Sequence, residues 1–81
     1  MKKQQLPEWF TAEKYKEGGV VSQRFSGMKY TLTAEELSMH DFIMGATMMM
    51  EMGMLKNDEE LTKGLGWFKK NNEDAYNFLF N

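Results

Sequence analysis

His40 and Asp41 are the neighbouring pair in this sequence whose side chains suggest acid–base chemistry. An imidazole and a carboxylate can exchange a proton when they touch. Both residues fall in a stretch that predicts a helix, where adjacent side chains leave the axis about 100° apart, so we expect no relay between them. Glu36 precedes His40 by four residues, a spacing that allows a pair across one helical turn. We therefore expect an ordinary surface histidine beside acidic residues.

Other chemical motifs are incomplete. Glu36, His40 and Glu51 do not have the spacing of His-Glu-x-x-His or Glu-x-x-His metal sites. The acidic run 58–60 lacks the alternation and the glycine of a calcium loop, and Gly18-Gly19 lacks the lysine of a phosphate loop. The chain has no cysteine, which removes thiol nucleophiles and disulfides. We expect no enzymatic activity, no cofactor and no metal.

The element that must position these residues is a long central helix, predicted over 33–55. Thr33 and Glu36 have the spacing of a capping box, and Gly53 marks the end. The helix is apolar on more than one side, which means that it must be covered on two sides. One stripe is Met39, Phe42, Ile43, Ala46, Met49, Met50 and Gly53. A second line is Leu37, Met44, Met48, Met52 and Leu55.

Methionine is concentrated in this helix: the chain has nine, and six lie between Met44 and Met54. Methionine is unbranched and polarizable, so it fits irregular cores and adaptable binding surfaces alike. Three interpretations remain open: a methionine-padded core, a surface for protein binding or self-association, and a soft-metal site, which lacks cysteine. A chain of this length buries only about 60% of its unfolded surface, so we expect part of the helix to meet another chain. The candidate protein-binding residues are Met44, Met48 and Met52.

The N-terminal segment contains two adjacent large aromatic residues. Residues 1–5 are polar and we expect them to fray, whereas segment 6–17 contains Trp9 and Phe10. Two interpretations are open for this pair: docking on the body of the domain, or an exposed patch for a partner, which makes both residues candidate protein-binding residues. Residues 11–16 predict a short turn of helix.

A β-hairpin is predicted over residues 20–32. Ser26-Gly27 has the length and chemistry of a tight turn, and the alternation of Tyr30 and Leu32 with polar residues allows one face to be buried. Two strands are marginal alone, so the hairpin must lie against the central helix or pair with another edge.

Two further helices are predicted, a second helix over 58–70 and a short C-terminal helix over 72–80. Gly64 and Gly66 either weaken the second helix or permit close approach to the central one. The fold class is therefore α+β, a single small domain. Its N-terminal segment and hairpin pack on a central long helix that one or two shorter helices follow.

Charge and hydropathy argue against two classes of partner. The net charge of −2 and the pI near 5.3 argue against nucleic acid, which needs a basic patch. His40, Asp41 and Glu51 interrupt the apolar centre, which falls short of a membrane span. Polar residues follow the N-terminal lysines where a signal peptide would be apolar, so we expect a cytoplasmic protein.

The chain also resembles a group of small, mostly uncharacterised proteins encoded by marine tailed phages, of the cyanophage type. The resemblance spans nearly the whole chain, and Asp41-Phe42-Ile43-Met44-Gly45 is its most specific part. The other matching residues are Leu6-Pro7-Glu8-Trp9-Phe10, Phe25-Ser26-Gly27, Tyr30, Leu32, Ala34-Glu35-Glu36-Leu37-Ser38-Met39, Gly64-Leu65, Trp67-Phe68, Asn72 and Ala75-Tyr76. The chain departs from the group at His40, where the group has tyrosine, at Glu73, where it has proline, and in its denser methionine cluster.

The resemblance implies an accessory phage protein that acts in the host bacterial cytoplasm and offers no catalytic residues to carry over. We therefore expect a small effector that binds a host protein, possibly a metabolic or regulatory enzyme, and modulates it. One alternative is a self-assembling structural or assembly accessory protein, which would form homo-oligomers. The second is a nucleic-acid-associated regulator that uses Lys2, Lys3, Lys14 and Lys16.

Overall fold

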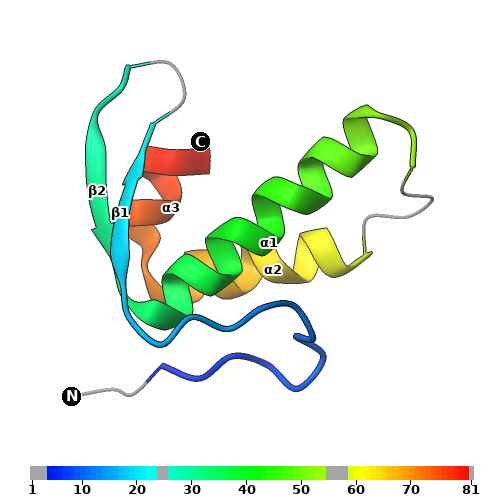
Figure 1. Cartoon of the computed structure of the whole chain (residues 1–81), viewed down its shortest axis with the longest axis horizontal. Helices are drawn as coiled ribbons and strands as arrows, with labels where there is room; N and C mark the ends of the chain where they lie inside the picture. Colours follow the sequence, from blue (N-terminus) through cyan, green and yellow to red (C-terminus); the bar gives the residue numbers. More distant parts are fainter. Residues whose placement is uncertain (1–3, 24–25, 55–58, 81) are drawn as a thin grey trace.

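The computed structural model describes residues 4–23, 26–54 and 59–80. Its elements follow one another as β1 (Gly19–Ser22), β2 (Lys29–Leu32), α1 (Ala34–Glu51), α2 (Glu59–Asn71) and α3 (Glu73–Phe80). This order confirms the predicted α+β fold. Figure 1 shows the hairpin beside α3, α1 running from the base of the hairpin across α2, and the N-terminal segment passing along one edge of the helices.

Local signals set both ends of α1. Thr33 is the N-cap: its hydroxyl accepts from the backbone N–H of Glu36 at 3.2 Å, and the Glu36 carboxylate accepts from the N–H of Thr33 at 3.0 Å. The predicted capping box is therefore confirmed. The predicted end at 55 is wrong, because the helix stops at Glu51.

The early end of α1 has a clear backbone cause. Gly53 has a φ of 73°, a left-handed conformation that turns the chain out of the helix. The N–H of Gly53 donates to the carbonyl of Met50 at 3.0 Å, and that of Met54 donates to the carbonyl of Met49 at 2.9 Å. These are the two bonds of a Schellman motif, which closes a helix. Leu55 lies outside the described residues.

The hairpin prediction is confirmed, with shorter strands than expected. β1 pairs antiparallel with β2, with Val21 opposite Tyr30 and Gly19 opposite Leu32. Gly27 has a φ of 73° and makes the turn, and the predicted first arm extends into residues 24–25, which lie outside the described part of the chain. Leu32 is buried in the core, and the Tyr30 ring contacts that of Phe78 in α3, with 5.4 Å between ring centroids.

The chain enters the hairpin by passing very close to its second strand. A Cβ atom on Gly18 would lie 2.1 Å from the backbone carbonyl oxygen of Leu32. No side chain fits at that distance, so only glycine allows the N-terminal segment to pass there.

The core draws one or two side chains from almost every element. Its buried residues are Phe10, Leu32, Met39, Ile43, Phe68 and Ala75. Phe68 is fully buried and meets the ring of Phe80 edge-on, with 5.2 Å between centroids. The central helix contributes Met39 and Ile43 to this cluster, and Ala46, one turn further on, is also buried.

The N-terminal segment docks on the helices without forming one. Phe10 lies in the core, and the Trp67 indole N–H donates to the carbonyl of Gln5 at 2.8 Å. The helical turn predicted over residues 11–16, all described, is wrong: the N–H of Tyr15 donates to the Ser38 hydroxyl at 2.9 Å, so it is satisfied by α1 rather than by its own segment.

The Glu36 carboxylate joins three parts of the chain. It is buried, with 3% of the residue exposed. Beyond Thr33, it accepts from the side-chain amide of Gln4 at 2.7 Å and from that of Asn72 at 3.0 Å. Asn72 in turn caps α3, accepting from the N–H of Ala75 at 3.2 Å. One side chain therefore connects the N-terminal segment, the start of α1 and the start of α3.

We predict that Glu36→Ala lowers the free energy of unfolding by about 3 kcal/mol, because it removes several charge-assisted hydrogen bonds at once and leaves part-buried donors without their acceptor. Urea denaturation followed by circular dichroism measures this. Glu35→Ala is the control, since Glu35 occupies the same first turn and also favours the helix dipole but is only half-buried. Equal losses in the two variants would contradict the role assigned to Glu36.

The two glycines of α2 have different surroundings. A Cβ on Gly64 would lie 3.2 Å from the sulfur of Met39, so this glycine permits close approach to α1, as the sequence suggested. A Cβ on Gly66 would meet no atom of the described residues within 4 Å. Gly66 therefore only weakens the helix.

We predict that Gly66→Ala raises the free energy of unfolding by about 1 kcal/mol through helix propensity. Gly64→Ala should fall short of that gain by about 1 kcal/mol or more, because its methyl group crowds the fully buried Met39. The two variants carry the same substitution at different positions of α2, and urea denaturation measures the free energy of unfolding of each. Identical stabilisation would show that α1 and α2 are not closely packed at Gly64.

Candidate protein-binding surface

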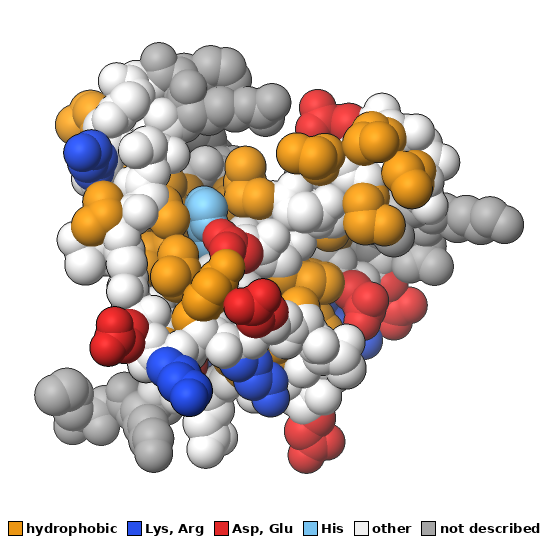
Figure 2. All heavy atoms as spheres, in the orientation of Figure 1, with side chains coloured by type: hydrophobic (Ala, Val, Ile, Leu, Met, Phe, Trp, Pro, Cys, Tyr) orange, Lys and Arg blue, Asp and Glu red, His pale blue; other side chains and the backbone are white. Residues whose placement is uncertain are grey.

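Six methionines at the C-terminal end of α1 are exposed, and we call them the methionine surface: Met44, Met48, Met49, Met50, Met52 and Met54. Figure 2 shows hydrophobic side chains gathered over this end of the helix. The most exposed are Met52, at 64%, Met54, at 62%, and Met48, at 61%. The interpretation of the cluster as core padding is wrong for these six, whereas Met39, nearer the N-terminal end of α1, is fully buried.

The exposure has a structural cause. α2 begins at Glu59 and packs on the middle of α1 through Gly64, close to Met39, Phe42 and Ile43. Figure 1 shows the two helices diverging beyond this contact. Met49 and Met50, which the sequence placed on the core stripe, therefore lie beyond the point where α2 covers α1.

A groove separates the diverging helices. It has a volume of about 360 Å³, and its lining residues are Asp41, Phe42, Gly45, Ala46, Met49, Glu60 and Leu61. Its apolar floor comes from both helices, and each helix supplies one carboxylate. Met49 belongs both to the groove and to the methionine surface, so the two form one continuous apolar region.

Trp9 and Phe10 are not part of this region. Phe10 has only 3% of its surface exposed and cannot offer area to a partner. Trp9 is half-buried, and the rings of both residues lie 5.6 Å from the ring of Phe42, measured between centroids. Phe42 also lines the groove, so Trp9 and Phe10 pack against a residue of the groove wall without lining the groove themselves. Of the five predicted binding residues, the structure brings Met44, Met48 and Met52 to one surface and separates Phe10 from them.

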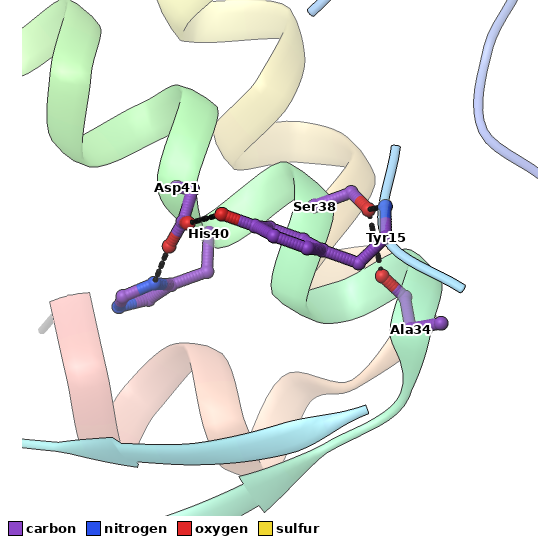
Figure 3. Close-up of polar contacts among 5 residues, drawn as sticks. All are labelled: Tyr15, Ala34, Ser38, His40 and Asp41. Carbon is purple, nitrogen blue, oxygen red and sulfur yellow. Dashed lines mark hydrogen bonds and ion pairs between the residues drawn. The ribbon is translucent and has the colours of Figure 1, made fainter. Parts of the chain in front are cut away.

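A polar network follows α1 on the side that faces the N-terminal segment (Figure 3). The Asp41 carboxylate contacts His40 Nδ1 at 3.3 Å and accepts a hydrogen bond from the Tyr15 hydroxyl. Helix geometry led us to expect no relay between His40 and Asp41, yet the two side chains do make contact. Helix geometry separates the bases of the two side chains, but the Asp41 carboxylate turns toward the ring. The pair of His40 with Glu36 that their spacing allows does not form, since the Glu36 carboxylate accepts from Gln4 and Asn72 instead.

This network holds the N-terminal segment against α1. Ser38 is buried, and its hydroxyl donates to the carbonyl of Ala34 at 2.8 Å while accepting from the N–H of Tyr15. Its proton and its lone pair are thus both engaged in structure. Tyr15 was not singled out from the sequence, because it lies 26 residues from Asp41 and nothing local indicates the contact.

The described lysines that were proposed to contact nucleic acid have acidic residues beside them in the chain. Lys14 and Lys16 are exposed but alternate with Glu13, Tyr15 and Glu17 along the chain. Opposite charges of equal number cancel the field that phosphates would need. Lys2 and Lys3 lie outside the described residues.

The described residues contain neither a metal-binding cluster nor a membrane-spanning helix. In residues 4–23, 26–54 and 59–80, no group of three or more histidines and carboxylates is placed to hold a metal ion. In that same part of the chain, no helix has the length and apolarity needed to cross a membrane.

The Asp41 carboxylate raises the pKa of the Tyr15 phenol above its ordinary value of 10.0, first by accepting its hydrogen bond and then by its negative charge. The folded protein therefore holds this proton more tightly than the unfolded chain. The stability that this contact contributes is fully present below a pH of about 10 and is lost as the pH rises through the raised pKa.

We predict that Asp41→Asn lowers the pKa of Tyr15 toward its ordinary value, because the charge and the strong acceptor are gone. Ultraviolet absorbance measured during an alkaline titration reports this pKa, and subtracting the curve of Tyr15→Phe isolates the one tyrosine. Asp74→Asn, which removes a carboxylate from the exposed first turn of α3, is the control and should change nothing. An unchanged Tyr15 titration in Asp41→Asn would show that the contact is absent in solution.

Comparison with protein-family models, with curated proteins and with solved structures found no match to this chain. Assignment of a function therefore depends on the side chains and surfaces described above.

Proposed function

We propose that this protein binds another protein through the methionine surface and has no catalytic activity of its own. The observation that carries the proposal is the exposure of six methionines in the second half of α1 and just after its end. Contiguous exposed apolar side chains rimmed by polar ones mark interaction sites in small domains.

Burial of this surface would supply the binding energy. Covering a methionine side chain stabilises a complex by about 1.5–3 kcal/mol, before the costs of association. The flexible thioether side chains also adapt to a partner's shape, which branched side chains do less well. Met44, Met48 and Met52, spaced by four residues, form a stripe along α1 that a partner can cover in one contact.

A more specific proposal concerns the partner. The resemblance to small marine phage proteins implies a phage effector that modulates a host protein in the bacterial cytoplasm. The most specific part of that resemblance is Asp41-Phe42-Ile43-Met44-Gly45. Asp41, Phe42 and Gly45 line the groove, and Met44 belongs to the methionine surface. The stretch that carries the resemblance therefore coincides with the surface that carries the proposal.

Self-assembly is the second candidate, because another copy of the chain can cover the same methionines. Light scattering on a sizing column distinguishes the two. A defined homo-oligomer supports an assembly role, whereas a monomer that retains one host protein in a tagged pull-down from bacterial lysate supports the effector role.

We predict that the double variant Met48→Gln, Met52→Gln abolishes association in both measurements while helix content stays unchanged. Glutamine matches methionine in length and helix propensity but is costly to bury. The control is Met28→Gln on the hairpin, since Met28 is 60% exposed, almost as much as Met48, but lies outside the methionine surface. Association that survives the double variant, or is lost equally in the control, would overturn the assignment of the surface.

A further inference from the structure

We infer that the groove between α1 and α2 takes a basic amphipathic helix of the partner protein, an inference that rests on the protein-binding function proposed above. Three features of the groove lead to this occupant: its open floor, its acidic rim and its position between two helices.

The floor leaves room for the approach of a third helix. A Cβ on Gly45 would meet no atom of the described residues within 4 Å, so the space above this part of α1 is open. Ala46 and Leu61 add short apolar surface on either side. Helices pack with their axes about 8–10 Å apart, at the lower end when the residues in contact are small.

The rim carries negative charge from both helices. Asp41 comes from α1 and Glu60 from α2, and no lysine or arginine is among the described residues that line the groove. Within α1, all of which the structure describes, the last turn holds Glu51 and no basic residue, so the negative end of the helix dipole is not compensated within the helix. A partner with lysine or arginine beside its apolar residues would meet complementary charge along the whole groove.

This charge pattern argues against two other occupants. A second copy of the chain, docked groove to groove, would bring the same carboxylates toward one another. An acidic amphipathic helix would meet like charge on both rims. A basic helix with apolar residues at positions i, i+3 or i+4 and i+7 satisfies the floor and the rim together.

Two synthetic peptides of about 18 residues, or five helical turns, test the inference. One has leucines on one face and lysines elsewhere, and the other has glutamates in place of the lysines. Each carries a fluorescent label, and fluorescence anisotropy measures its binding to the full chain. We expect the leucine–lysine peptide to bind at least about tenfold more tightly, and salt to reduce the difference.

Two variants show whether the groove is the site. Gly45→Leu fills the open space without displacing a neighbour and favours the helix, so the fold should persist, which circular dichroism checks. We expect it to weaken binding of the leucine–lysine peptide at least about tenfold. Gly66→Leu is the matched control, because Gly66 is an exposed helical glycine with open space that does not line the groove, and it should bind the peptide normally.

One further pair tests the rim. Glu60→Gln should weaken binding of the leucine–lysine peptide about threefold or more, whereas Glu73→Gln removes the same charge from α3, outside the groove, and should have a much smaller effect.

The inference about the partner is overturned if both peptides bind equally or if Gly45→Leu binds the leucine–lysine peptide as the unmodified chain does. Protein binding through the methionine surface would still stand in that case if Met48→Gln, Met52→Gln abolishes association. If that double variant also has no effect, the proposed function fails as well.

Discussion

The buried carboxylate of Glu36 is the interaction on which the arrangement of the chain depends. Removing a carboxylate from water costs several kcal/mol unless donors replace the water. Here the donors come from Gln4, Thr33 and Asn72, so the N-terminal segment, the start of α1 and the cap of α3 must all be in place before the charge is satisfied. The bonds to Gln4 and Asn72 therefore tie the start of α1 to the N-terminal segment and to the start of α3.

The central helix has two unlike halves. Its first half contributes Met39 and Ile43 to the core and is held by the polar contacts of Glu36, Ser38 and Asp41. Its second half extends past the contact with α2, and there the same kind of apolar side chain is left exposed. A continuous apolar helix in a short chain therefore serves two purposes, one inside the domain and one at its surface.

The parts of this fold that could be predicted from the sequence are those set by interactions between residues close together in the chain. The capping box at Thr33 and Glu36 and the hairpin turn at Gly27 each depend on residues within a few positions of one another. The predicted end of α1 ran past the stop that the sequence marked at Gly53, where a local Schellman closure ends the helix. The prediction for residues 11–16 failed because the N–H of Tyr15 bonds to Ser38, 23 residues away.

The candidate site could be predicted only in part, because one part of it depends on helical spacing and the other on contacts between distant residues. The methionine line was visible because it depends on helical spacing alone. The groove was not, because it depends on where α2 leaves α1. In the same way, the contacts of Glu36 with Gln4 and Asn72 and of Asp41 with Tyr15 span 26 to 36 residues of the sequence. Phe10 was placed in two alternative roles because aromatic type alone does not determine burial.

The methionine surface also gives the protein a chemical sensitivity that its core does not share. Oxidation converts a methionine thioether into a sulfoxide, which turns a flexible apolar side chain into a polar one. Met48 and Met52 are open to solvent, whereas Met39 is shielded completely. An oxidant would therefore change the surface before it touched the fold, and reduction of the sulfoxides would restore it.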